Sequence, residues 1–210
     1  MMRLFAIVLL ALPLVATASL ETTVAGDHRT ESYVLRDDAR HPAEVLEFFG
    51  VEADDTVVEI WPSAGYWAEI LGPFLAQDGQ YIAAAFDVGP KSTPAYRRRA
   101  HGKLLGKLSD ADLYGRPIIS TVDQPDHWMM AEPGSVDVVL SFRNVHNWWW
   151  GDFADEMFAA AFAALKPGGV LGIVDHRAPA GTDSDMLKSQ RTGYMTEADV
   201  VGLALAAGFK

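Results

Sequence analysis

Polar side chains stand at or shortly after the ends of four apolar runs in the sequence. These side chains are Glu59, Asp87, Asp123, Asn144 and His146. Ligands of open α/β sheets bind at the carboxyl ends of the strands. If the four runs are parallel strands of one sheet, these residues meet at one edge and form a single binding site. Carboxylates there would accept hydrogen bonds from ligand hydroxyl or amino groups, and an imidazole would act as a base.

The segment SFRNVHNWWW, residues 141–150, is unusually polar and aromatic for a connecting loop. Asn144 and His146 are the candidates for contacting a substrate, with His146 as a base for a protic nucleophile. The alternatives are a hydrogen-bonded structural histidine and an aromatic plug formed by Trp148 to Trp150. The sequence leaves these alternatives open.

Further histidines and acids lie elsewhere in the chain. Asp175 and His176 follow the apolar run at 170–174, so they either face the same cleft or orient its loop. His41 precedes Pro42 in the tripeptide RHP. The spacing of the histidines and acids does not match a metal site, and no metal is expected.

The stretch VVEIWPSAGYWAEIL, residues 57–71, has the order of a strand, a loop and a helix that opens nucleotide-binding α/β domains. That loop is usually rich in glycine so that a ligand can approach the backbone. Here Trp61 and Pro62 precede Ser63, Ala64 and Gly65. Since Pro62 has no N–H group and Trp61 fills space, a dinucleotide pyrophosphate is disfavoured.

Strand and helix patterns alternate along most of the chain. Strands are expected at 55–60, 81–86, 117–121, 136–142 and 170–174. The uniformly apolar character of the first is typical of a parallel strand buried on both faces. Helices are expected from Pro42 to Gly50, at 64–76, at 95–107, across 152–169 and from an N-cap at Thr196. This alternation predicts a doubly wound, mostly parallel α/β sheet in one domain at 39–210.

The first residues differ from the rest. Residues 1–18 combine a basic start, an apolar run and the tripeptide ATA, so they predict a cleaved signal peptide and a periplasmic or secreted protein. The apolar run is shorter than the roughly 20 residues of a membrane span. Residues 19–38 lack periodicity and are expected to form an exposed arm. The net charge of −11 disfavours nucleic acid binding, and the absence of cysteine excludes disulfides and thiol nucleophiles.

The acids at the strand ends, together with SFRNVHNW and LKPGGVLGIVDHR, resemble the class I S-adenosylmethionine-dependent methyltransferases. Within them, the stretch VVEIWPSAGYWAEIL is similar to that of a group of predicted exported methyltransferases. The resemblance implies a Rossmann-like fold, S-adenosylmethionine as cofactor and a small-molecule acceptor. It also places the RHP tripeptide with His41 near the cofactor lid.

The resemblance implies roles for the cofactor-binding residues. Ser63, Ala64 and Gly65 would allow close approach to the cofactor, which carries no phosphate. Asp87 would accept from the ribose hydroxyls, or else cap a helix or turn. Glu59 would hold the cofactor ammonium indirectly, or else cap N–H groups of the loop.

Asp123 would accept from the adenine amino group, or else serve as an ordinary turn residue before Pro125. The family continues into an antiparallel hairpin, whereas this sequence stops at Lys210, so we expect a truncated domain or self-association through the fifth strand. A non-catalytic binding or scaffold protein of the same fold is the alternative function. A nicotinamide oxidoreductase is a third class, weakened by Trp61 and Pro62.

Overall fold

The computed structural model describes residues 19–210, so the predicted signal peptide, residues 1–18, lies outside the described part of the chain. Five strands form one sheet in the order β3-β2-β1-β4-β5, and every pairing between them is parallel. The strands are β1 (Thr56–Ile60), β2 (Gln80–Ala85), β3 (Ile118–Thr121), β4 (Val136–Phe142) and β5 (Leu165–Val174). The predicted doubly wound, parallel α/β fold is confirmed.

Strand β1 lies at the centre of the sheet and is where the strand order reverses. Glu59 of β1 is level with Ala83 of β2 on one side and with Leu140 of β4 on the other. The chain runs from β1 outward through β2 to β3 and then returns to β4. The crossovers from β1 and β4 therefore diverge at the carboxyl ends of these two strands, and a crevice forms there.

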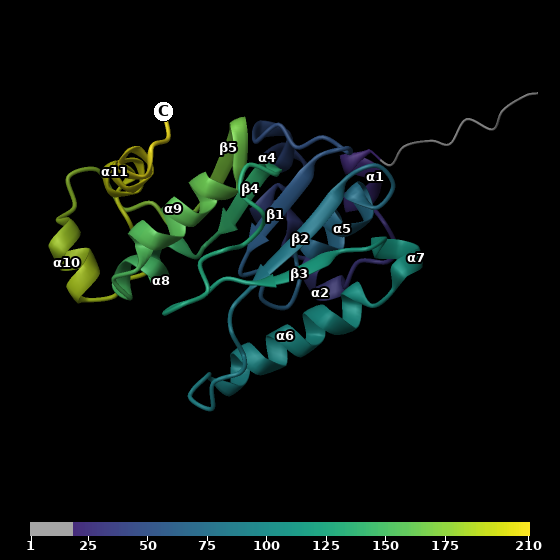
Figure 1. Cartoon of the computed structure of the whole chain (residues 1–210), viewed down its shortest axis with the longest axis horizontal. Coiled ribbons are helices and arrows are strands. Elements are labelled where there is room, and N and C mark those ends of the chain that lie inside the picture. The colour runs from purple at the N-terminus through teal and green to yellow at the C-terminus, as the bar shows by residue number, and fades with distance from the viewer. Residues whose placement is uncertain (1–18) are drawn as a thin grey trace, which may run out of the picture.

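Helices cover both faces of the sheet. One face carries α4 (Pro42–Phe48), α5 (Ala68–Leu75), α6 (Ala95–Leu108) and α7 (Ala111–Tyr114). The other carries α8 (Val145–Trp150), α9 (Ala154–Ala164) and α11 (Glu197–Ala207), with α10 (Ser184–Ser189) against α8. Figure 1 shows helices α8 to α11 gathered beside β4 and β5, with α5 and α1 behind the sheet. Each face of the sheet packs against its own apolar core. Because protein cores are close-packed, the strands are held rigidly between the two layers of helices.

Two predicted boundaries are wrong. Helix α9 ends at Ala164 rather than at the glycines after Pro167, and the LKPGG segment already belongs to β5. Pro167 is tolerated in this strand because β5 lies at an edge of the sheet. The segment after β4, expected as a loop, forms the short helix α8. The predicted N-cap is confirmed, since the Thr196 hydroxyl accepts from the Asp199 N–H at 3.1 Å.

No antiparallel hairpin joins the sheet within residues 19–210. Strand β5 pairs with β4 alone in this part of the chain, and Val170 is 40% exposed. Self-association through this strand stays a prediction.

The expectation of an exposed arm at residues 19–38 is wrong. This segment forms three short helices, α1 (Leu20–Val24), α2 (Glu31–Val34) and α3 (Asp37–Arg40), and it packs on α4 and α5. Leu20 and Thr23 are buried, and so is Arg29. The segment shows no helical periodicity because its helices span four or five residues each and are held by polar contacts as well as apolar ones.

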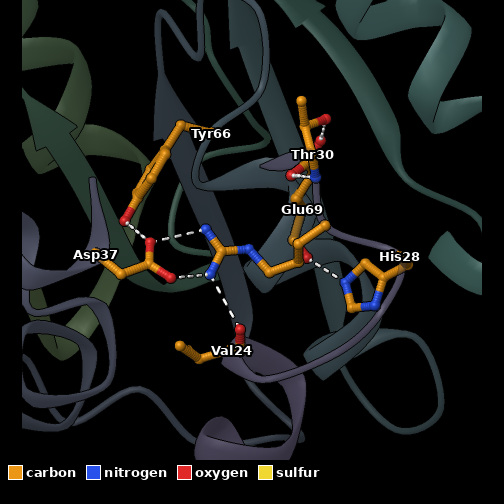
Figure 2. A network of polar contacts seen from close by, with 7 residues as sticks. Val24, His28, Thr30, Asp37, Tyr66 and Glu69 are labelled. Atoms are coloured by element: carbon orange, nitrogen blue, oxygen red, sulfur yellow. Dashed lines mark hydrogen bonds and ion pairs between the residues drawn. The ribbon is translucent and has the colours of Figure 1, made fainter. Parts of the chain in front are cut away.

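A buried polar network attaches this segment to the domain (Figure 2). The Arg29 guanidinium donates to both carboxylate oxygens of Asp37, at 2.6 and 3.0 Å, and its side chain is fully buried. The Tyr66 hydroxyl donates to the same carboxylate at 2.5 Å. Glu69 of α5 accepts from the Thr30 N–H at 2.9 Å and pairs with Lys107 of α6. The network fixes α2 and α3 over the carboxyl end of β1.

Candidate functional site

The loop after β1 has the backbone of a glycine-rich loop although it carries only one glycine. Trp61, Ser63 and Gly65 have φ angles of 52°, 55° and 89°, which is the left-handed region. For a residue with a side chain this conformation costs about 1–2 kcal/mol. Trp61 and Ser63 therefore adopt a conformation that favours glycine, at an energetic cost. The close approach to a cofactor expected of Ser63, Ala64 and Gly65 stays a prediction.

A cavity of about 340 Å³ opens at the crevice between β1 and β4. The loop after β1 forms its floor with Trp61, Pro62, Ser63 and Ala64. The other walls come from α2 and α3, from the buried end of β1, and from the segment that follows β4. Their residues are Tyr33, Arg36, Arg40, Glu59, Tyr66, Trp67, Phe142, Arg143, Asn144 and His146. We call this cavity the first chamber.

A second chamber of about 220 Å³ lies on the other side of Trp61. It is lined by Trp61, Arg97, Asp123, Gln124, Asn147, Trp150, Gly151, Phe153 and Arg191. The Trp61 indole N–H donates to the Val122 carbonyl at 2.7 Å, and the Arg97 guanidinium lies 4.8 Å from its ring centroid. Because these contacts fix the indole, Trp61 forms a wall common to both chambers.

Glu59 is buried at the end of β1 and lines the first chamber. Its carboxylate accepts from the Tyr81 hydroxyl at 2.6 Å, and burial raises the pKa of Glu59 to about 8. Burial therefore favours the protonated, uncharged form of this side chain. Among the described residues its hydrogen bond is to Tyr81 and not to N–H groups of the loop, so the expected capping role is not observed.

Asp87 and Asp123 meet at the ends of β2 and β3. The Asp87 N–H donates to the Asp123 carboxylate at 3.1 Å, and the Gln124 N–H donates to its other oxygen at 2.9 Å. Arg97 lies 3.6 Å from the same carboxylate. Burial raises the pKa of Asp123, while these hydrogen bonds and Arg97 oppose the shift. Asp123 lines the second chamber, and Asp87 is more exposed, with one oxygen accepting from the Gly89 N–H at 2.8 Å.

His146 lies in the first turn of α8 and is oriented by a carboxylate. Its Nδ1 lies 2.7 Å from Asp175, and the Asp175 carboxylate also accepts from the His146 backbone N–H at 3.1 Å. A carboxylate at Nδ1 favours the proton on that nitrogen, which leaves Nε2 as the basic atom. The Asn147 amide nitrogen lies 3.1 Å from Nε2, consistent with this tautomer. Asp175 therefore orients the segment after β4, which is one of the two roles expected for it.

Asn144 has a structural contact in addition to lining the first chamber. Its side-chain amide donates to the Ile60 carbonyl at 3.0 Å and so links the ends of β1 and β4.

The other two candidate histidines lie apart from His146 in role. His176 accepts from the Arg143 side chain at 2.9 Å. The pKa of His176 is lowered mainly by burial and also by the nearby Arg143 guanidinium. His41 does not line either chamber. It lies between α3 and α4 and pairs with the exposed Glu44 at 3.6 Å.

Sequence reasoning missed Tyr33, Arg36 and Arg40, which α2 and α3 bring to the first chamber. The Tyr33 hydroxyl donates to the Ala64 carbonyl at 3.0 Å and thereby contacts the loop after β1. Tyr33 lies in α2, Arg36 is the N-cap residue of α3 and Arg40 lies in α3. Because they come from two short helices, no helical spacing in the sequence indicated that they would share a wall.

The described residues contain no helix that is long and apolar enough to cross a membrane. Residues 19–210 also hold no group of three or more histidines and acids arranged to bind a metal ion.

Comparison with solved structures identifies the fold. A S-adenosylmethionine-dependent methyltransferase from Aquifex aeolicus aligns with 82% of this chain and 81% of its own, at 16% identity and a TM-score of 0.60. An arsenic(III) S-adenosylmethionine methyltransferase from Chlamydomonas reinhardtii aligns with 92% of this chain and 62% of its own, at 17% identity and a TM-score of 0.57. The chain has the class I S-adenosylmethionine-dependent methyltransferase fold.

The [4+2]-cyclase SpnF has the same fold, aligning with 90% of this chain and 67% of its own at 17% identity and a TM-score of 0.58. No family model matches the sequence, and no curated protein matches it. Because one fold here includes proteins named for different reactions, the reaction has to be argued from the site.

Proposed function

We propose that this protein transfers a methyl group from S-adenosylmethionine to a small molecule. The observation that carries the proposal is the pair of chambers at the carboxyl ends of β1, β3 and β4, which share Trp61 as a wall. Their position at the strand-order reversal is where open α/β sheets bind ligands. Together they offer space on both sides of a loop whose backbone is shaped for close approach.

The residues present fit the cofactor at both ends. In the first chamber, guanidinium groups such as Arg40 suit the methionine carboxylate, and Ser63 and Ala64 line the same wall. In the second chamber, Asp123 accepts two backbone N–H groups, and a carboxylate has about four acceptor positions, so it can also accept from the adenine amino group. Asp87, at the end of β2, would accept from the ribose hydroxyls.

The side chains then have a limited chemical task. The cofactor, when bound, supplies a methyl group that is already activated on a sulfonium. The chain has to hold the acceptor in line, exclude water and remove a proton from a protic nucleophile. His146 is suited to the last step, because Asp175 orients its ring and Nε2 carries the lone pair.

Calorimetric titration with S-adenosylmethionine, S-adenosylhomocysteine and NAD tests the proposal. We expect the first two to bind and NAD not to bind, because Pro62 removes a donor that a pyrophosphate would need. Asp87→Ala should weaken the binding of S-adenosylhomocysteine by about 1.5–3 kcal/mol, the range for hydrogen bonds to a charged group. Asp54→Ala is the matched control, since Asp54 is exposed at the opposite edge of the sheet.

Absence of binding by the unmodified protein would reject the methyltransferase proposal and leave the non-catalytic binding protein. Equal affinity in Asp87→Ala and Asp54→Ala would remove Asp87 from the site.

We also propose that the protein is exported, on the composition of residues 1–18. Fractionation of the producing cells, followed by immunodetection, tests this, and recovery of the protein in the cytoplasmic fraction alone would contradict it.

A further inference from the structure

Three arginines gather around the first chamber. Arg36 and Arg40 come from the segment α2–α3, and Arg143 follows β4. Within residues 19–210, none of the three lies within 4.0 Å of a carboxylate, whereas Arg29, Arg97 and Arg177 each have such a partner. This concentration of positive charge stands out in a chain whose net charge is −11.

The carboxyl groups nearest the chamber form no ion pair with these arginines. Burial raises the pKa of Glu59 to about 8, which favours its uncharged form. Asp37 is bound by Arg29 and by the Tyr66 hydroxyl. The chamber wall therefore carries three guanidinium groups without a paired carboxylate among the described residues.

The arginines are close enough to affect one another. Burial lowers the pKa of Arg40, and the charges of Arg36 and Arg143 lower it further. The Arg40 guanidinium lies over the Tyr66 ring, 4.2 Å from its centroid, which fixes it at the chamber wall. Like charges held together are unfavourable, and a bound anion would relieve this repulsion. Guanidinium groups suit carboxylates and phosphates because they can donate two parallel hydrogen bonds.

We propose that the first chamber binds an acceptor carrying a carboxylate or phosphate group, held by Arg36 and Arg143. The inference rests on the proposed methyltransferase function, whose cofactor has a single carboxylate for Arg40 to hold. Two guanidiniums then remain at the entrance for a second anion. His146 lines the same chamber, so an acceptor anchored by its anionic group would present its nucleophile to the base.

The test uses the protein saturated with S-adenosylhomocysteine and titrated with inorganic phosphate or with acetate at constant ionic strength. The two probes distinguish a phosphate site from a carboxylate site. We expect one of them to bind, and the double variant Arg36→Gln/Arg143→Gln to bind it at least about tenfold more weakly, on the scale of charge-assisted hydrogen bonds. Arg36→Lys/Arg143→Lys keeps the charge and should recover part of the affinity.

The matched control is Arg99→Gln/Lys103→Gln, two exposed basic residues on α6 that line neither chamber. It should bind the anion within about twofold of the unmodified protein, on the weak energetics of exposed charges. Arg36 and Arg143 are exposed as well, so a melting temperature close to that of the unmodified protein is expected for the double variant.

Equal anion affinity in the double variant and the control would overturn the proposal, and so would absence of binding by both probes. Displacement of S-adenosylhomocysteine by the anion would also overturn it, because the arginines would then serve the cofactor carboxylate alone. If S-adenosylhomocysteine does not bind while arginine-dependent anion binding persists, the methyltransferase proposal fails and the anion site stands.

Discussion

Replacing Asp37 by asparagine should be the most damaging single change of charge in the N-terminal segment. The variant removes the counter-charge of Arg29, whose side chain is fully buried and which donates to Asp37 at 2.6 and 3.0 Å. Removing one partner of a buried ion pair costs about 3–5 kcal/mol, because the remaining charge is left uncompensated. We therefore expect Asp37→Asn to lower the free energy of unfolding by that amount.

Removing Arg29, the other partner of this ion pair, should lower the free energy of unfolding by less. In Arg29→Met the remaining charge is Asp37, whose side chain is 18% exposed and still accepts from the Tyr66 hydroxyl. Water and Tyr66 can then satisfy the carboxylate, so a loss of roughly 1–3 kcal/mol is expected. Glu197→Gln is the matched control, since its pair with Arg177 is 3.4 Å long and about three-quarters exposed on both sides. Such pairs contribute about 0–1 kcal/mol.

Urea denaturation followed by tryptophan fluorescence measures these differences, and hydrogen exchange of residues 19–40 detects detachment of the segment without global unfolding. Since Arg36 is the N-cap residue of α3, directly before Asp37, Asp37→Asn should also weaken binding of the anion to the first chamber. If Asp37→Asn changes neither the unfolding midpoint nor the hydrogen exchange more than Glu197→Gln does, the ion pair does not hold this segment and the reasoning is wrong.

Three further predictions concern the site and the processing of the chain. The folded pKa of Glu59 is about 8, above its ordinary value of 4.5, so the stability that its protonated form contributes is full below pH 4.5 and is lost as the pH rises through 8. Relative to Glu59→Gln, the unmodified protein should lose roughly 3–5 kcal/mol of unfolding free energy over that range, and parallel stability curves would contradict this. His146→Gln should keep the fold and cofactor affinity but lose at least about 100-fold in turnover once an acceptor is found. His41→Asn, which lies outside both chambers, should keep its turnover, and normal turnover with a lowered melting temperature in His146→Gln would make that histidine structural. N-terminal sequencing of the exported protein should return Ser19, and a sequence starting at Met1 would refute cleavage.

Much of the fold could be predicted because the relevant signals are local. The uniformly apolar run at 55–60 indicated a strand buried on both faces, and the buried β1 confirms it. Alternation of strands with helices indicated a parallel sheet. Since the carboxyl ends of parallel strands lie at one edge, the same reasoning placed Glu59, Asp123 and His146 at that edge, where Glu59 and His146 line the first chamber and Asp123 lines the second. The boundary at Pro167 was wrong because proline usually ends a helix, while here an edge strand accommodates it.

The conformation of the loop after β1 was only partly predictable. The sequence indicates a small-residue turn ending at Gly65, but residue types alone do not predict that Trp61 and Ser63 adopt left-handed φ angles. That conformation is held by tertiary contacts, among them the hydrogen bond from the Trp61 indole to the Val122 carbonyl. The same contacts make Trp61 the wall between the chambers.

By itself the sequence determined the class of fold and the edge of the sheet at which the polar residues meet. Only the tertiary structure decided that residues 19–40 form a wall of the site, carrying Arg36 and Arg40 into it. The partners that hold this segment are distant in sequence, with Thr30 bonded to Glu69 across 39 positions and to Lys107 across 77. Periodicity reports which side of an element is buried. It does not report which distant charges will be buried together, because that depends on how the packed helices bring them into contact.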